Sequence, residues 1–362
     1  MATSKADLAR QMIEGRIAHA DYVLEGLPAE RELAQQLGLS RATVRTALQD
    51  LTRDGTLNRH DNGRLHIAAS GAAQKAIGFA ALVRPSPDVE LWRDGVTGAL
   101  EGREALFRSV AFAHWDDAIL ADAIARFDGL FLVPPSEGIP TRIARKMRTA
   151  RCRVVVLDQN ECEAGLPSAT MFPPASLTKL FDHLVALGHA RIDCLNTQAP
   201  DSQIRGRIAA WRAFTHERGI GGCLRTKSEK KPILSAYEMV RAALEEGRPL
   251  ASALFCTTGP AALGAMRALH EAGLQIGRDI SVAAINSEGL GRFLCPSLTA
   301  LEAPPRALVL RRAVEWMLGD DEWSGPLHLQ PDDAPLFQGE STGSAPASPL
   351  VFTPRSTQAS PF

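Results

Sequence analysis

The chain has 362 residues, of which 45% are hydrophobic and 22% are charged. At roughly 150 residues per domain this length gives two or three folded units, and the composition excludes a miniprotein, a disordered tail and a polycation. Because 40 basic side chains face 41 acidic ones, the net charge is -1, so any contact with nucleic acid must come from a local basic patch.

The first predicted elements are two short helices joined by a tight turn. The first helix follows Pro28 and ends at Gly38, which can adopt the left-handed backbone that such a turn needs. Ser40 can cap the second helix. Ala34 is small where the helices approach, and Val44 fills the space between them. This spacing predicts a helix-turn-helix.

The second helix carries polar and basic residues in its first turn and a half: Ser40, Arg41, Thr43 and Arg45. A recognition helix meets base edges and phosphates at this position. Arginine can bind guanine through two hydrogen bonds, and hydroxyls and the helix N-terminus can bind phosphate. We therefore predict DNA contacts here, the alternative being an ordinary solvated helix face.

A hairpin is predicted next, because residues 56–60 and 64–67 alternate in polarity around Asp61-Asn62-Gly63. This hairpin would be the wing of a winged helix. Residues 39–67 contain five arginines and three aspartates, a modest basic excess. Such a small domain contacts few phosphates, so we expect salt-dependent binding to a two-fold symmetric duplex by a homodimer.

Three stretches resemble the winged-helix domain of GntR-type bacterial regulators: Ile13–Gly15, Leu27–Ala34 and Gly38–Leu48. The match covers nearly all of residues 7–68. The resemblance implies DNA contacts at Arg31, Arg41, Thr43, Arg45 and Gly63. The family's longer glycine-rich wing tip is replaced here by Asn62-Gly63-Arg64, which adds Arg64 to the predicted contacts.

From Ile77 onward, short apolar runs alternate with helical segments, the pattern of parallel βαβ units. The predicted strands are 77–83, 109–113, 130–133, 153–157, 191–195, 253–256 and 281–285. They form two clusters separated by Pro174–His189. The pattern predicts an α/β fold with two doubly wound sheets across a cleft, and a ligand at the carboxyl ends of the strands.

Several segments in this region resemble the LacI-type effector domain, which shares its fold with periplasmic sugar-binding proteins: Gly188–Ile192, Arg207–Trp211, Ala262–Leu269, Asp279–Val282 and Pro296–Thr299. The resemblance implies a two-lobed domain that binds an effector and dimerises. We expect the winged helix over residues 1–68, a linker over 69–75, the two-lobed domain over 76–342 and a disordered tail over 343–362.

By the same resemblance, Arg207 matches an arginine that hydrogen-bonds effector hydroxyls, and its planar fork suits vicinal hydroxyls or a carboxylate. Asp158 resembles a pocket position, although an aspartate at a strand end can also cap the next turn. Trp92, near the start of a helix, could stack on a sugar face or lie in the core.

The family usually has aspartate at the positions of Gly259 and Asn286, and an aspartate-asparagine pair at Pro173-Pro174. These departures predict a neutral pocket wall, in which Asn286 and Thr258 can hydrogen-bond a polar ligand. Without the two carboxylates, an acidic effector such as a sugar phosphate or sugar acid would fit better, so the expected effector is a sugar, a sugar phosphate or a sugar acid. The alternative is a cleft that no longer binds a ligand.

The sequence contains no Walker-type phosphate loop, no His-Glu-x-x-His zinc motif and no Gly-x-Ser-x-Gly nucleophile motif. Six cysteines occur without a Cys-x-x-Cys pair, which is typical of reduced thiols and not of a zinc site. There is no apolar run long enough to span a membrane and no export signal. We expect a cytoplasmic protein without catalytic residues, cofactor, metal or membrane partner.

These features together predict a one-component transcriptional regulator, with repression as the default expectation. A small carbohydrate-like effector in the cleft would change the geometry between two DNA-binding heads and so the affinity for the operator. One alternative is a solute-binding protein of the periplasmic class with an incidental helical N-terminus. Another is an α/β enzyme tethered to DNA.

Overall fold

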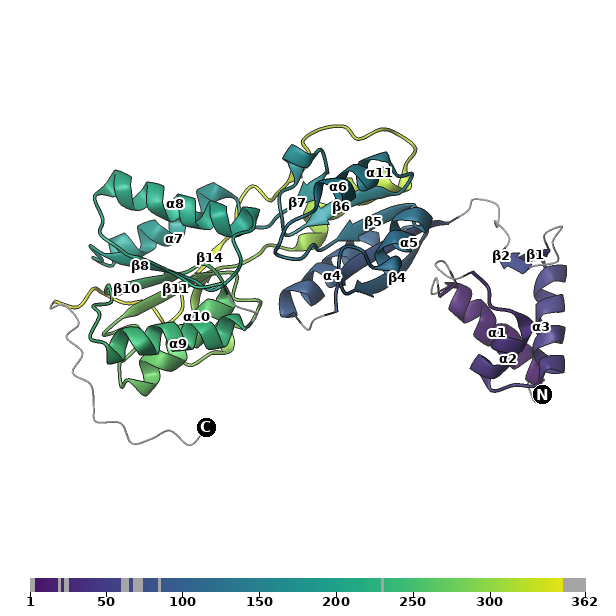
Figure 1. The fold of residues 1–362 in the computed structure, drawn as a ribbon, viewed down its shortest axis with the longest axis horizontal. Helices are drawn as coiled ribbons and strands as arrows, with labels where there is room; N and C mark the ends of the chain where they lie inside the picture. The colour runs from purple at the N-terminus through teal and green to yellow at the C-terminus, as the bar shows by residue number, and fades with distance from the viewer. Residues whose placement is uncertain are drawn as a thin grey trace.

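The computed structural model describes residues 4–18, 21–22, 26–59, 65–67, 74–83, 86–228 and 231–347. A small helical domain with a two-stranded hairpin is followed by two α/β lobes, each built on a six-stranded sheet (Figure 1). This architecture confirms the predicted fold class. Within the described part of the chain, no helix is both long and apolar enough to cross a membrane.

The N-terminal domain has three helices and one hairpin. They are α1 (Lys5–Ala18), α2 (Glu30–Leu37), α3 (Arg41–Arg53), and β1 (Leu57–Arg59) paired antiparallel with β2 (Leu65–Ile67). Their core is formed by fully buried side chains: Ala9, Ile13, Leu33, Val44, Ala47, Leu51 and Leu57. Gly38 ends α2 with a φ of 64°, and the Ser40 Oγ accepts a hydrogen bond from the Thr43 N–H at 3.1 Å. Both turn residues therefore act as the sequence predicts.

The first lobe contains an all-parallel sheet in the order β13-β7-β6-β5-β3-β4. Its strands are β3 (Lys75–Leu82), β4 (Ala105–Phe112), β5 (Gly129–Leu132), β6 (Arg153–Leu157), β7 (Ser168–Ala169) and β13 (His328–Leu329). One face packs on α5 (Ala118–Arg126) and α6 (Thr141–Thr149), and the other on α4 (Pro87–Leu100) and α11 (Arg306–Leu318). A short 3-10 turn, η1, covers Cys162–Ala164.

The second lobe contains a sheet in the order β14-β12-β11-β10-β8-β9, parallel except for β14. Its strands are β8 (Ile192–Asn196), β9 (Leu224–Thr226), β10 (Ala253–Cys256), β11 (Ser281–Ile285), β12 (Thr299–Leu301) and β14 (Leu336–Phe337). The helices α7 (Pro174–Ala186) and α8 (Ser202–Arg218) cover one face, and α9 (Pro232–Glu245) and α10 (Gly259–Glu271) cover the other (Figure 1). The 3-10 turn η2 covers Gly291–Phe293.

Three segments connect the lobes. The chain leaves the first lobe between β7 and α7, returns between β12 and α11, and crosses again between β13 and β14. Because the strands within each lobe are nearly all parallel, the loops that follow them gather at one end of each sheet. Loops of both lobes line one cavity between the lobes, as the next section describes.

Several predicted boundaries differ from the structure, most of them by a single residue. The second strand begins at Ala105, not at residue 109, and Lys75, assigned to the linker, already belongs to β3. The disorder predicted from residue 343 is wrong for residues 343–347, because these find polar partners on the second lobe. The Gly343 N–H donates to the Ser281 Oγ at 3.0 Å, and the Ala345 N–H donates to the Leu187 carbonyl at 2.8 Å. Residues 348–362 lie outside the described residues.

Candidate functional site

The predicted DNA-contacting arginines of α3 are exposed and gather around one carboxylate. The Arg45 guanidinium donates to both Glu30 oxygens, at 2.7 and 3.0 Å, and the Arg41 Nε lies 3.6 Å from Glu30 Oε1. The hydrogen bond from Arg45 lowers the pKa of the Glu30 carboxyl. Glu30, from α2, was not singled out by the sequence analysis, although it stands beside the matched residue Arg31.

The remaining predicted contacts divide into two groups. Thr43 lies on the same exposed end of α3, with its Oγ1 2.8 Å from the Ser40 Oγ, and Arg31 is exposed on α2. Gly63 and Arg64, at the tip of the wing, lie outside the described residues. The described contacts therefore form one surface that joins the first turns of α2 and α3.

The second candidate site is a cavity of about 220 Å³ between the two lobes. Four of the five predicted effector residues line it: Asp158, Arg207, Thr258 and Asn286. Asp158 follows β6, Thr258 follows β10, and Asn286 follows β11. All three therefore lie at the carboxyl ends of strands, where the sequence predicts the ligand. Arg207 reaches the cavity from α8 and donates through Nη1 to the Thr257 carbonyl at 2.8 Å.

Trp92 does not line this cavity. Its side chain is fully buried in the core of the first lobe, where the Arg306 guanidinium lies 5.0 Å from the ring centroid. The proposed stacking on a sugar face is therefore wrong, and the core interpretation is right. The physical reason is that Trp92 lies on the face of α4 that packs against the sheet.

Backbone strain is concentrated at the cavity. Among the described non-glycine residues, positive φ angles occur at Asp158 (63°), Asn286 (59°) and Glu288 (54°), and all three line the cavity. Residues held in this region cost free energy and are found preferentially at binding and catalytic sites. Their common position at strand ends supports the cavity as a functional site.

The cavity wall is acidic, which corrects the predicted neutral wall. Four carboxylates line it, on Asp88, Asp158, Asp201 and Glu288, against one guanidinium, on Arg207. Burial and the neighbouring Asp88 raise the pKa of the Asp158 carboxyl well above its usual range. Burial next to Asp88 also raises the pKa of Glu288 to about 7. An acidic effector is therefore disfavoured here.

Three of these carboxylates, Asp88, Asp201 and Glu288, were not predicted, because segments distant in the sequence bring them together. Asp88 lies in the first turn of α4 and accepts hydrogen bonds from Arg306 Nη2 at 2.6 Å and from Asn286 Nδ2 at 2.8 Å. Asp201 caps α8, the helix of Arg207, through the Ile204 N–H. A helix-cap aspartate just before Arg207 was a signal available in the sequence, whereas the contact between Asp88 and Asn286 was not.

The presence of glycine at position 259, where the family usually has aspartate, has a steric explanation. A Cβ atom at this position would lie 2.5 Å from the Asn286 carbonyl oxygen, because the first turn of α10 packs directly on the loop after β11. The Gly259 N–H also donates to that oxygen at 3.1 Å. No side chain fits here without a backbone shift, so the aspartate of the family could not simply be restored.

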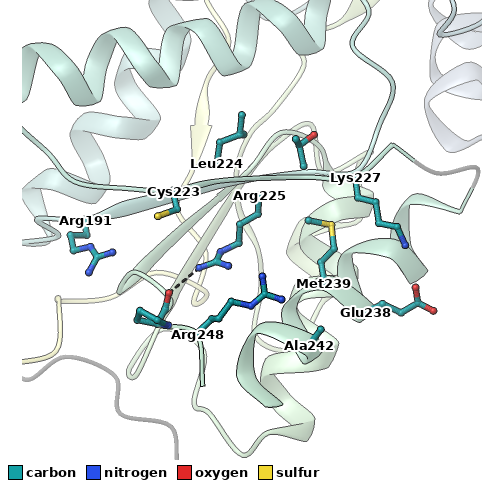
Figure 2. Close-up of a pocket in the computed structure, with 11 residues that line it drawn as sticks. Arg191, Cys223, Leu224, Arg225, Lys227, Glu238, Met239, Ala242 and Arg248 are labelled. Atoms are coloured by element: carbon teal, nitrogen blue, oxygen red, sulfur yellow. Dashed lines mark hydrogen bonds between the residues drawn. The ribbon is translucent and has the colours of Figure 1, made fainter. Parts of the chain in front are cut away.

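A second cavity, of about 660 Å³, lies at the edge strand β9 and beside α9 (Figure 2). Arg191, Arg225, Lys227 and Arg248 line it. Arg225 donates to the Pro249 carbonyl at 2.9 Å, a hydrogen bond that is drawn as the dashed line from Arg225 in Figure 2. All of its lining residues belong to the second lobe, so a ligand there would not bridge the lobes. Across the described ranges, no group of three His, Cys, Asp or Glu side chains could hold a metal ion.

Comparison with known families gives two matches. The model of bacterial regulatory proteins of the gntR family matches residues 5–67. The model of the periplasmic binding protein-like domain matches residues 181–324. The first match lies in the helical domain, and the second begins within α7 and extends through the second lobe and all of α11. They agree with both resemblances drawn from the sequence.

Curated relatives are transcriptional regulators. The chain is 31% identical over 127 residues to the lactose operon repressor of Escherichia coli, a match covering 35% of each protein. It is 25% identical over 161 residues to the regulator GalR of Streptococcus thermophilus, covering 43% of this chain and 49% of that protein. The matches thus span about a third to a half of the length of these relatives.

Solved structures show the same two-lobed fold. The lac repressor dimer bound to operator and the anti-inducer ONPF has a TM-score of 0.61 and 20% identity, covering 76% of this chain and 96% of that chain. A LacI family regulator from Arthrobacter sp. FB24 in complex with lactose has a TM-score of 0.62 and 18% identity, covering 74% and 100%. The chain joins a winged helix of the bacterial gntR type to a periplasmic-binding-protein-like domain similar to those of LacI-type regulators.

Proposed function

We propose that this protein is a ligand-regulated transcriptional repressor that acts in the cytoplasm and catalyses no reaction. The observation that carries the proposal is the exposed first turn of α3, where Ser40, Arg41, Thr43 and Arg45 lie together on a helix-turn-helix of the gntR type. These donors suit phosphates and guanine edges in the major groove of duplex DNA. Arg31 and the wing residues Gly63 and Arg64 are proposed to add contacts beside them.

The domain division is part of the proposal. Residues 1–68 would bind DNA and residues 76–342 would bind the effector and dimerise, with the linker between them. The ordered residues 343–347 extend the second unit, since they bond to α7 and to the second-lobe sheet.

Regulation is proposed to depend on the cavity between the lobes. Direct interlobe hydrogen bonds run from Asn286 Nδ2 to Asp88 at 2.8 Å and from the Asn160 N–H to the Ser202 Oγ at 2.9 Å. A ligand that contacts both lobes binds one interlobe arrangement better than another and shifts the population toward it. In a dimer, that shift changes the spacing between two recognition helices and hence the affinity for a two-fold operator.

The dimer is proposed to form through the exposed face of α9 and α10. Ile233 and Leu234 on α9 are 49% and 44% exposed, and Leu290 after β11 is 44% exposed. These residues line an open depression of about 1580 Å³ together with Pro260 and Leu263, charged side chains of α9 and α10, and a few residues of the first lobe. Exposed apolar side chains gathered in this way are typical of a protein interface, and the similar lac repressor structure is a dimer. We therefore propose a second copy of the chain as its partner.

The test of the proposal is selection of duplexes from a random DNA pool by the full-length protein. A DNA-binding repressor should enrich a two-fold symmetric sequence, and addition of the effector should reduce its recovery. Arg41→Ala/Arg45→Ala should enrich nothing beyond background, while Arg126→Ala/Arg145→Ala, in exposed residues of the first lobe, should behave as wild type. Equal enrichment by the α3 double variant would refute the proposed DNA-binding surface.

A further inference from the structure

Three hydrogen-bond acceptors that find no partner within the described ranges line the cavity between the lobes. Gln159 is 4% exposed and donates from Nε2 to the Pro135 carbonyl at 3.1 Å, which leaves its buried Oε1 without a partner in the described part of the chain. The carboxylates of Asp158 and Glu288 likewise accept no hydrogen bond from any described residue. All three acceptors line the cavity.

Arg207 supplies a buried donor beside these acceptors. Arg207 is 7% exposed, and while its Nη1 bonds to the Thr257 carbonyl, its buried Nε has no partner among the described residues. The guanidinium also lies 5.5 Å from the centroid of the Phe172 ring, which fixes its position. A ligand that pairs with these groups must therefore offer donors to the three acceptors and an acceptor to the Arg207 Nε.

The charges of the cavity favour a ligand that carries a positive charge. Arg306, behind the wall, is bound to Asp88 and offsets its charge. That leaves the carboxylates of Asp158, Asp201 and Glu288 facing the single guanidinium of Arg207. Burial and then the charge of Asp88, which Arg306 offsets only in part, raise the pKa values of Asp158 and Glu288. A bound cation would remove the repulsion, whereas a phosphate or carboxylate would add to it.

We propose that the cavity binds a small ligand carrying an ammonium group beside hydroxyl groups, of the amino sugar or amino polyol class. The ammonium would pair with the carboxylates of Asp158 and Glu288, and the hydroxyls would donate to the Gln159 Oε1 and accept from the Arg207 Nε. The volume of about 220 Å³ is below that of sites for drug-sized molecules, which fits a single small ring or chain. This inference rests on the proposed effector role of the cavity.

The first test is isothermal titration calorimetry of the full chain with matched probes. Glucosamine, galactosamine, mannosamine and the corresponding amino alditols are compared with their hydroxyl counterparts, their N-acetyl derivatives and the hexose 6-phosphates. At least one amine should bind at least tenfold tighter than its neutral counterpart, and Asp158→Asn should abolish the difference. Asp122→Asn, an exposed carboxylate on α5, is the matched control and should bind as wild type. Tighter binding of a neutral or phosphorylated member, or binding of no amine, would overturn the proposal.

The second test needs no ligand. If the cavity holds surplus negative charge, Glu288→Gln and Asp158→Asn should each raise the melting temperature of the ligand-free chain at pH 8. Asp122→Asn should leave the melting temperature unchanged. Equal or lower melting temperatures of both cavity variants would contradict the charge argument. Measuring operator binding of the same proteins distinguishes the ligand class from the proposed repressor function. If only the ligand class is wrong, the proteins still bind the operator; if the repressor function is wrong, they do not.

Discussion

At the scale of single residues, Glu30 is the group that would compete most directly with DNA for the proposed contact residues of α3. It holds Arg45 through two hydrogen bonds and lies beside Arg41, so phosphates must compete with it for both guanidinium groups. The pairs are exposed, and exposed ion pairs contribute little to the free energy of unfolding. The effect of Glu30 should therefore appear in DNA affinity and hardly in stability.

We predict that Glu30→Gln raises the affinity for duplex DNA by about three- to tenfold because it frees both arginines. Fluorescence anisotropy with a labelled duplex at fixed salt measures this change. Glu32→Gln, an exposed neighbour on the same helix, controls for the general loss of one negative charge. Equal gains for the two variants would mean that Glu30 does not restrain the arginines.

Glu288 gives a pH-dependent prediction. Its pKa is raised from 4.5 to about 7 in the folded chain, so folding favours the protonated carboxyl. The resulting stabilisation is fully present below pH 4.5 and is lost as the pH rises through 7. In denaturant unfolding, the free energy of unfolding of wild type should fall by on the order of 1–2 kcal/mol between pH 5 and pH 8. That of Glu288→Gln should not show this fall. Parallel pH profiles of the two proteins would contradict the shifted pKa.

At the scale of elements, the contact between α10 and the loop after β11 sets the shape of the cavity wall. Gly259→Ala should lower the free energy of unfolding by about 1–3 kcal/mol, because its Cβ would meet the Asn286 carbonyl. Gly206→Ala in α8, where no atom lies within 4 Å of the added carbon, should be neutral or stabilising by up to about 1 kcal/mol. Urea unfolding of both variants compares them, and equal changes would remove the steric explanation.

The sequence predicted the central, buried strands well. The strands at 153–157, 253–256 and 281–285 have the predicted bounds, because each is a mainly apolar run that is buried on both faces. The helix-turn-helix was also predicted correctly, since Gly38 and Ser40 determine the turn locally. The short strands β7, β13 and β14, each of two residues, carry no periodic pattern and were not predicted.

The charge of the cavity could not be predicted in the same way. Its wall combines side chains from α4, α8 and several strand-end loops, which meet only through the tertiary fold. Reading one strand end at a time gave a neutral wall at Gly259 and Asn286. The contact of Asn286 with Asp88 joins residues 198 positions apart, and no local sequence pattern encodes it.

At the scale of the whole molecule, the proposed repressor requires two copies of the chain. Leu234→Glu places a charge on the apolar face of α9 and should convert a dimer into a monomer, because a buried unpaired carboxylate is costly. Sedimentation velocity measures the change in mass. Ile119→Glu on α5 is a matched control, since both side chains are 44% exposed. A Leu234→Glu protein that remains dimeric would place the interface elsewhere.

The central claim is that the first turn of α3 binds duplex DNA. The most direct measurement is the affinity of the full chain for its selected duplex between 50 and 200 mM salt, for wild type and for Arg41→Ala/Arg45→Ala. The account predicts that wild-type binding falls at least about tenfold over this range and that the double variant shows no specific binding at any salt. Binding of the double variant with wild-type affinity and the same salt dependence would contradict it.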